Sequence, residues 1–311
     1  MLSAHRGARA AASWNVRGGR YDKQVNTSTV HTFDVAGTRT HVWEYGAADG
    51  WPVFLVHGFR GDHHGLEGLA ESLAEKNPGK RFLVPDLPGF GETGPMAGVE
   101  HNLAAYGDWL VALVAEAAPE GHTMLGHSFG SLVVSAALRA GLSPDQVILI
   151  NPIASPALEG PQAVLTQLAI GYYKAGSLLP ERAAKELLGN RLIVRVMSEV
   201  MAKTRDPELR AWIHAQHHAY FSAFSDSATL LEAFKASVSH TVREFAGEYR
   251  VPTLLIVGDR DDITPLAAQL DLQRRIPGAT LRIIPGTGHL VHYEAVADAA
   301  AWITDALGDA E

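Results

Sequence analysis

Residues 126–130 have the sequence Gly-His-Ser-Phe-Gly, and they restrict the possible folds more than any other part of the chain. The apolar run before them, residues 122–125, predicts a strand, and residues 132–139 have the amphipathic pattern of a helix. The five residues therefore predict a tight turn between strand and helix, with Ser128 at the turn in a backbone conformation that few residues tolerate. The glycines on either side lack a Cβ, so the strand and the helix can pass close to each other.

Two later strand ends carry side chains that can act together with Ser128. The apolar run at residues 251–257 predicts a buried strand, and it leads into residues 258–262, Gly-Asp-Arg-Asp-Asp, where a carboxylate can orient a histidine. A further strand at residues 281–284 leads through a glycine-containing loop to His289. A serine, an acid and a histidine at strand ends are the parts of an activated nucleophile.

Backbone N–H groups for a developing negative charge are predicted nearby. Residues 52–56 predict another buried strand, which ends in the turn His-Gly-Phe at residues 57–59. This turn can aim the N–H of Phe59 at the oxygen of a tetrahedral intermediate. The N–H of Phe129, next to Ser128, is the second expected donor of this oxyanion hole.

Strand and helix patterns alternate along most of the chain. Residues 30–33 and 40–45 predict an antiparallel hairpin, and alternating helical and strand patterns follow as far as residue 150. Such alternation predicts a mainly parallel sheet with helices on both faces. Ligands bind to these sheets beyond the carboxyl ends of the strands, which is where all the side chains named above are placed.

The chain is expected to divide into a tail, a core and an insertion. Residues 153–243 have apolar stripes at helical spacing and no buried-strand pattern, and about 90 residues are too many for a loop, so they predict a helical cap. The core is expected at residues 27–152 and 244–311. Residues 1–26 are basic with little periodicity and predict a disordered tail. Four aromatic side chains of the cap can either line a substrate pocket or pack the cap on the core: Tyr172, Tyr173, Phe221 and Phe224.

In this order the motifs resemble those of the α/β-hydrolase superfamily, and the chain looks like a serine esterase or lipase-like member with a helical cap. The resemblance covers roughly residues 30–307. It implies a mostly parallel eight-stranded sheet flanked by helices. It rests on five motifs: residues 57–59, 85–91, 126–130, 258–265 and 288–289.

The resemblance also assigns roles to residues. It implies Ser128 as nucleophile, Asp261 as triad acid and His289 as general base, with Phe59 and Phe129 as the oxyanion donors. Relatives usually carry the acid three residues after a glycine at the strand end and four before a proline, which residues 258–265 match at Asp261. Asp262 is the second choice and Asp259 the third.

The composition excludes several classes of protein. The 311 residues carry a formal charge of −8, and no basic stripe follows a predicted helix, so no nucleic-acid partner is expected. The absence of cysteine rules out disulfides, thiolate catalysis and cysteine-ligated metals. No apolar run approaches the roughly 18 residues that cross a bilayer, and residues 1–26 lack the apolar segment of a secretory signal. We therefore expect no integral membrane association and a cytoplasmic location.

The 15 histidines do not form a metal-binding motif. The adjacent pairs, His63 with His64 and His217 with His218, would point about 100° apart on a helix and would not easily share one metal. No metal and no cofactor are expected.

The expected activity is hydrolysis of carboxylic esters of small to medium, fairly apolar molecules through an acyl-enzyme intermediate. The sequence leaves open two other enzymes, a carbon–carbon bond hydrolase of ring-cleavage products and an acyltransferase. A serine at position 128 excludes the alkyl-enzyme chemistry of relatives that carry an aspartate there. A ligand receptor with a slow triad is the alternative outside enzymes. The oligomeric state is open, with a homodimer as one arrangement.

Overall fold

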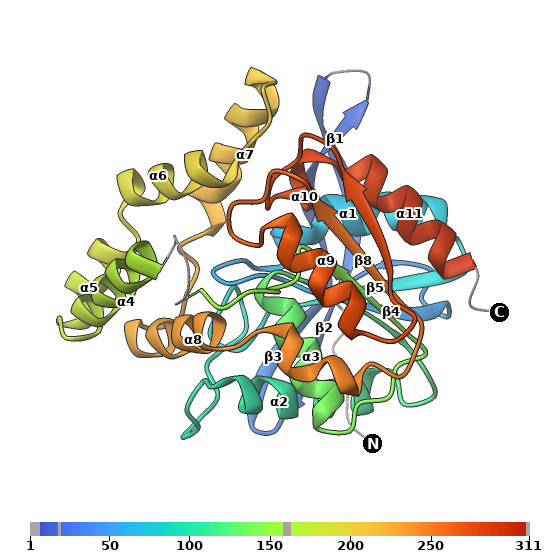
Figure 1. The fold of residues 1–311 in the computed structure, drawn as a ribbon, viewed down its shortest axis with the longest axis horizontal. Helices are drawn as coiled ribbons and strands as arrows, with labels where there is room; N and C mark the ends of the chain where they lie inside the picture. The colour runs from blue at the N-terminus through green and yellow to red at the C-terminus, as the bar shows by residue number, and fades with distance from the viewer. Residues whose placement is uncertain (1–6, 18–19, 158–162, 309–311) are drawn as a thin grey trace.

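The computed structural model describes residues 7–17, 20–157 and 163–308, and these form one nine-stranded sheet with helices on both faces (Figure 1). The order of strands across the sheet is β1-β2-β3-β5-β4-β6-β7-β8-β9. Neighbouring strands from β5 to β9 pair in parallel, whereas β1, β2 and β3 pair in antiparallel fashion, as do β3 and β5. The strands are β1 (Gly7–Arg17), β2 (Arg20–Val35), β3 (Thr38–Gly46), β4 (Trp51–Val56), β5 (Lys80–Pro85), β6 (Thr123–His127), β7 (Gln146–Ile150), β8 (Thr253–Gly258) and β9 (Thr280–Ile284).

The mostly parallel sheet with flanking helices confirms the expected fold class. Strands β2 to β9 make up the eight strands that were expected, and β1 adds a ninth at the edge. The expected hairpin is formed by β2 and β3, whose register pairs Val35 with Thr38. Every residue of β6, β7 and β8 is buried, which explains why these central strands have continuous apolar sequences.

The sheet separates two apolar cores. Side chains of a strand alternate between the two faces, so in β4 Val53 and Leu55 enter one core, and Phe54 and Val56 enter the other. The first core is covered by α1 (His63–Lys76) and α11 (Val296–Gly308). The second is covered by α2 (Leu103–Ala117), α3 (Phe129–Arg139) and α9 (Leu266–Arg275). The chain also forms the short helix α10 (Val291–Glu294) and a 3-10 helix, η2 (Val242–Glu248).

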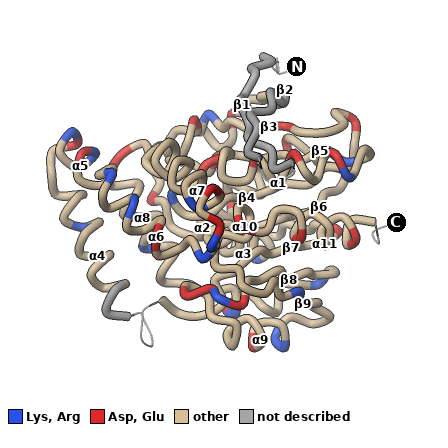
Figure 2. Tube along the Cα trace, turned by 90° about the horizontal axis from the view of Figure 1, so that it is seen from above, with Lys and Arg blue, Asp and Glu red and all other residues tan. Residues whose placement is uncertain are grey.

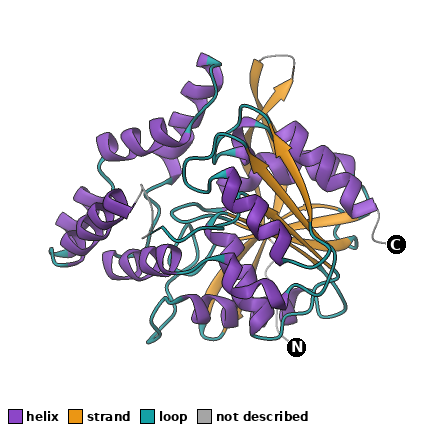
Figure 3. Cartoon of the chain, viewed as in Figure 1, coloured by secondary structure: helices purple, strands orange, loops and turns teal. Residues whose placement is uncertain are grey.

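In the described part of the chain, five α-helices follow β7 before η2 and the return to the sheet at β8. Figure 3 shows that the described part of this insertion contains helices and loops, grouped on one side of the sheet. The apolar stripes at helical spacing predicted this secondary structure. The helices are α4 (Ala163–Ser177), α5 (Glu181–Leu188), α6 (Arg191–Met201), α7 (Pro207–Tyr220) and α8 (Ser227–Ser239).

The structure differs from the expected disordered tail wherever the tail is described. Gly7–Arg17 and Arg20–Val35 are strands, and they pair with each other from Gly7 and Val30 to Arg17 and Arg20. An edge strand offers unpaired backbone N–H and C=O groups, and pairing with them requires no alternation of apolar side chains. This is why the sequence pattern missed β1. Residues 1–6, 18 and 19 lie outside the described residues.

Charged residues of both signs occur along the described chain. Figure 2 shows basic and acidic positions interspersed along the described part of the trace. None of the described helices combines the length and apolar character that a bilayer crossing requires.

Candidate active site

Ser128 occupies the turn between β6 and α3. Its φ of 52° and ψ of −118° lie in a region that residues with a side chain rarely adopt, and its N–H donates to the carbonyl of Ile150 over 3.1 Å. The flanking glycines are required by close backbone contacts. A Cβ on Gly126 would lie 2.7 Å from the carbonyl oxygen of Gly130, and a Cβ on Gly130 would lie 2.1 Å from that of Val56. The sequence of the turn therefore dictates its geometry.

The structure brings Ser128, His289 and Asp261 together. Ser128 Oγ is 2.7 Å from His289 Nε2, and His289 Nδ1 is 2.7 Å from Asp261 Oδ2. Both His289 and Asp261 are buried. Because a carboxylate only accepts hydrogen bonds, it holds the imidazole proton on Nδ1 and leaves Nε2 free to accept the proton of the serine hydroxyl.

Asp261 is held in its charged form. Its Oδ1 accepts the backbone N–H groups of Ile263 and Thr264, and its Oδ2 accepts from the Thr264 hydroxyl and the side-chain amide of Asn151. Burial on its own would raise the pKa of this carboxyl. The facing His289, with the hydrogen bonds of His289 and Thr264, outweighs burial and holds the pKa well below its usual range.

The two other acids of the loop after β8 have partners other than His289. Asp262 is exposed and forms an ion pair of 2.5 Å with the ammonium group of Lys203. Asp259 accepts the backbone N–H of Gly286 over 2.6 Å. Asp261 is thus the acid of this loop that faces His289.

Two backbone N–H groups lie beside the nucleophile. Phe129 is the first residue of α3, and the first N–H groups of a helix have no partner within that helix. Phe59 follows Gly58, where a Cβ would lie 3.2 Å from Ser128 Cβ, and the rings of Phe59 and Phe129 are 6.5 Å apart. Among the described residues, neither N–H is engaged in a hydrogen bond. The oxyanion hole formed by these two N–H groups stays a prediction.

Ser128 and His289 line a cavity of about 720 Å³ between the sheet and the inserted helices. Gly58, Phe59 and Phe129 also line it. The inserted segment contributes mainly apolar side chains, among them Met197, Val200, Met201, Phe221, Phe234 and Val238.

Of the four aromatic candidates, Phe221 lines this cavity. The other three are not among the described residues that line it. Tyr173 is buried against Phe234, with 4.3 Å between ring centroids, and Phe224 is buried in the same core. The Tyr172 hydroxyl donates to the carbonyl of Leu187. Of the two roles expected for them, these three residues therefore have the packing role and do not line the cavity.

Comparison with known proteins gives the family. A model described as the alpha/beta hydrolase family matches residues 53–302. The chain belongs to this family. It is 28% identical to the dihydrolipoyllysine-residue acetyltransferase component of the acetoin cleaving system of Pseudomonas putida over 84% of this chain and 65% of that longer protein. It is 24% identical to 2-hydroxymuconate semialdehyde hydrolase of Pseudomonas sp. (strain CF600) over 89% of this chain and 93% of that one.

Solved structures show the same fold. A thermophilic esterase from Thermogutta terrifontis superposes with a TM-score of 0.70 at 22% identity, covering 99% of each chain. At this identity the likeness concerns the fold, and activity has to be argued from the site.

Two residues of this hydrolase's site were missed by sequence reasoning. Asn151 follows β7 with a φ of 43°, and its fully buried side chain donates to Asp261 Oδ2 over 2.7 Å. Asparagine tolerates this left-handed conformation better than most residues, so its place at a strand end was an available signal. Arg60 is buried and donates to the carbonyls of Phe221 and Leu188. It ties the loop after β4 to the inserted helices, and no local signal marks it.

Among the described residues, Asp62, His63 and His64 offer possible metal-ligand atoms within 4.8 Å of one another. Contrary to expectation, the rings of His63 and His64 do not point apart, and their centroids are 3.8 Å from each other at the start of α1. His63 stacks on Trp43 and its Nδ1 lies 3.0 Å from Asp86 Oδ1, while Asp62 accepts the N–H of His64 as the helix N-cap. These contacts give the three side chains a structural role, and no metal is assigned to them.

The buried histidines of the site predict a loss of stability in acid. Burial, and then the neighbouring His289, lowers the pKa of His127 to about 3, and burial, and then His214, lowers that of His217 to about 3. In the unfolded chain such groups titrate near about 6.5, so between about pH 6.5 and 3 the unfolded state binds more protons. The free energy of unfolding therefore falls as the pH falls through this window, on the order of 1 kcal/mol per pH unit for each histidine.

Urea unfolding at neutral pH and near pH 5 measures this effect. The midpoint should be lower at the acidic pH, and His127→Gln should reduce the difference because glutamine takes up no proton in this range. Equal midpoints at the two pH values would show that these rings are protonated without opening the fold.

Proposed function

We propose that the protein is a serine hydrolase that cleaves carboxylic esters through an acyl-enzyme intermediate. The observation that carries this proposal is the hydrogen-bonded series Ser128, His289 and Asp261, with two distances of 2.7 Å, at the wall of a largely apolar cavity. A serine, a base and an orienting acid in this geometry form an activated nucleophile.

The first half of the reaction forms the acyl-enzyme. His289 Nε2 takes the proton of the Ser128 hydroxyl as Oγ attacks the ester carbonyl carbon. The carbonyl oxygen becomes negative and accepts hydrogen bonds from the N–H groups of Phe59 and Phe129, the two donors that we propose for the oxyanion hole. Asp261 stabilises the imidazolium. The proton then passes from Nε2 to the departing alkoxide, which leaves as an alcohol.

The second half releases the acid. A water molecule gives a proton to His289 Nε2 and attacks the acyl carbon, and the same two N–H groups stabilise the second tetrahedral intermediate. When it collapses, His289 returns the proton to Ser128 Oγ. The carboxylic acid leaves and the free enzyme is restored.

We also propose that residues 153–243 form a cap that binds the apolar part of the substrate. Residues 153–243 supply most of the apolar lining of the cavity that Ser128 faces, including Met197 and Met201 of α6 and Val238 of α8. Met197 and Met201 lie one turn apart on α6, and their flexible thioether side chains suit ligands of varied shape.

The test is a series of p-nitrophenyl esters from acetate to dodecanoate. Burial of each methylene is worth about 0.8 kcal/mol, so kcat/KM should rise several-fold per added carbon until the cavity is full. A flat profile, or a preference for acetate, would contradict an extended acyl site. Bulky polar esters should be poor substrates because their polar groups would lose water without gaining partners.

A pair of variants sharpens this test. Val238→Phe adds volume to the cavity lining and should move the optimum to a shorter ester. Val196→Phe adds the same volume on the exposed side of α6 and should leave the optimum unchanged. An optimum that stays in place in Val238→Phe would show that the acyl chain binds elsewhere.

Carbon–carbon bond hydrolysis is the second candidate. It is favoured by the match to a 2-hydroxymuconate semialdehyde hydrolase, which extends over 89% of this chain and 93% of that protein. Ring-cleavage dienoates assayed beside the esters decide between the two. Turnover of the dienoates well above that of every ester would replace the esterase proposal.

A further inference from the structure

One wall of the apolar cavity is polar. His217 from α7, and His292 and Tyr293 from α10, all line it. The ring centroid of Tyr293 is 5.7 Å from that of His217 and 4.2 Å from that of His292. The side chains of His217 and His292 are buried, so their ring nitrogens cannot rely on bulk water for hydrogen bonds.

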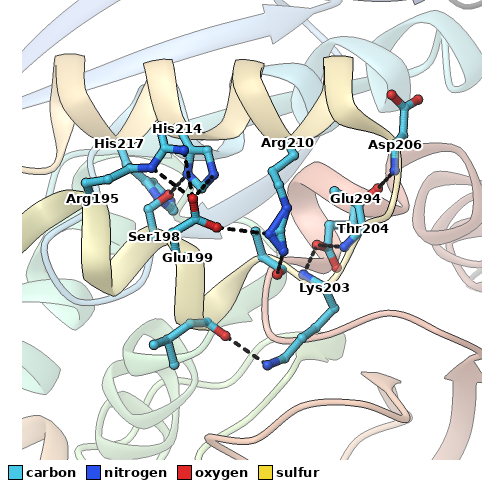
Figure 4. Close-up of polar contacts among 12 residues, drawn as sticks. Arg195, Ser198, Glu199, Lys203, Thr204, Asp206, Arg210, His214, His217 and Glu294 are labelled. Carbon is cyan, nitrogen blue, oxygen red and sulfur yellow. Dashed lines mark hydrogen bonds and ion pairs between the residues drawn. The ribbon is translucent and has the colours of Figure 1, made fainter.

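His217 belongs to a series of hydrogen bonds that links α6 and α7. Its Nδ1 is 2.7 Å from Ser198 Oγ, and the same Oγ is 2.6 Å from His214 Nδ1 (Figure 4). All three side chains are buried. The serine hydroxyl has one proton, so it donates to one imidazole and accepts from the other.

Glu199 determines which atom is the donor in each hydrogen bond of this series. Its Oε1 lies 3.3 Å from His214 Nε2, and its two oxygens accept hydrogen bonds from Arg195 and Arg210 (Figure 4). The hydrogen bond from Arg195, with the charges of Arg195 and Arg210, lowers the pKa of Glu199, so it faces His214 as a carboxylate. This contact lacks hydrogen-bond geometry, but a bare ring nitrogen would still be repelled by an oxygen at 3.3 Å, so we place the proton of His214 on Nε2.

The remaining protons follow from this placement. Burial, and then Arg195, lowers the pKa of His214, so the ring carries a single proton and its Nδ1 is an acceptor. Ser198 then donates to His214 Nδ1 and accepts from the Nδ1–H of His217. His217 is also neutral near pH 7, because burial lowers its pKa to about 3. Its Nε2 is therefore a bare acceptor, and among the described residues it has no hydrogen-bond partner.

We propose that His217 determines specificity by accepting a hydrogen bond at Nε2 from a hydroxyl group of the substrate. The substrate would be an ester that is apolar apart from one hydroxyl group. That hydroxyl would bind where His217 of α7 lines the cavity. A neutral acceptor repels a carboxylate and gains nothing from a methyl group, whereas a hydroxyl satisfies it. The proposal rests on the proposed ester hydrolysis, and Ser198 acts in it as a positioning residue.

Matched pairs of p-nitrophenyl esters test this assignment. The two esters of a pair have the same chain length and differ by one hydroxyl, which is moved along the chain from pair to pair. For one position the wild type should cleave the hydroxylated ester about tenfold better in kcat/KM than its partner, because a polar site discriminates against an analogue that leaves it unpaired. In His217→Phe this ratio should fall to one or below. His218→Ala changes the adjacent histidine, which does not line the cavity, and should keep the ratio.

Ser198→Ala is the second variant, and it keeps the imidazole of His217 in place. Without the hydroxyl, the tautomer of His217 is no longer fixed, so the ratio should fall and the ¹⁵N resonances of the ring should change from an Nδ1–H form to a mixture. A merely structural role of Ser198 would leave the tautomer unchanged. The proposal would be overturned if both variants kept the wild-type ratio. It would also be overturned if the wild type showed no preference at any hydroxyl position, as expected if water occupies Nε2.

Failure of the esterase proposal would be visible separately. If the wild type cleaves none of the esters, calorimetry with the same pairs measures recognition without turnover. Tighter binding of one hydroxylated ester, lost in His217→Phe, would support the assignment of His217 without ester hydrolysis. Equal affinities within every pair would contradict the assignment of His217 as the hydroxyl acceptor.

Discussion

Ser128→Ala is expected to abolish ester hydrolysis in a protein that remains folded. The covalent step needs Oγ, and neither His289 nor the two backbone N–H groups can replace it, so kcat should fall on the order of 10⁴-fold to 10⁶-fold. Alanine keeps the Cβ that Ser128 already places at a φ of 52°, so the turn takes on no additional steric strain.

Three measurements on this variant separate chemistry from folding. Thermal unfolding should be close to that of the wild type, and p-nitrophenyl butyrate hydrolysis should be at the level of the buffer. A reactive phosphonate should label the wild type at Ser128 and leave the variant unlabelled. Ser177→Ala, at the end of α4 and outside the cavity lining, is the matched control and should retain full activity. Substantial turnover by folded Ser128→Ala would remove the acyl-enzyme from the proposal.

The parts of the site that sequence could predict are those fixed by local geometry and by buried strands. The chain turns from strand to helix at Ser128. This turn requires glycine at positions 126 and 130, because a Cβ at either position would meet backbone atoms. The strands before Asp261 and before Ser128 are buried along their whole length, so their apolar sequences were visible. Parallel strands then place their carboxyl ends side by side.

The parts that sequence could not predict depend on contacts between distant segments. Tyr173 packs against Phe234, and the direction in which a helix turns its side chains is set by tertiary packing that periodicity does not reveal. Arg60 is buried because carbonyls of α5 and of the residue after α7 converge on its guanidinium, and a charged residue in a loop predicts exposure. The tautomer of His217 likewise depends on a serine 19 positions away on another helix.

The edge of the sheet shows a different limit. Strand β1 is held by backbone pairing with β2, and backbone groups are the same in every sequence. A basic segment with little periodicity therefore predicts a tail, although an open edge strand can accept it as a ninth strand.

Asp261→Asn is expected to have the second largest effect on catalysis. The substitution would place an amide where His289 Nδ1–H now meets a carboxylate, so the imidazole would lose both the fixed tautomer and the charge that stabilises the imidazolium. The value of kcat should fall on the order of 10⁴-fold, with a smaller change in KM because the residue does not line the cavity.

The adjacent acid provides the matched control for this variant. Asp262→Asn removes one exposed ion pair with Lys203, which contributes about 1 kcal/mol or less to stability. Asp262 lines the cavity but does not hydrogen-bond His289, so kcat should change little, and any effect should fall on KM. Both variants carry the same chemical change one residue apart in one loop, so general damage to the loop would lower both activities alike. A large loss in Asp262→Asn with a small one in Asp261→Asn would make Asp262 the acid, and the 2.7 Å contact between Asp261 and His289 would then have no part in the reaction.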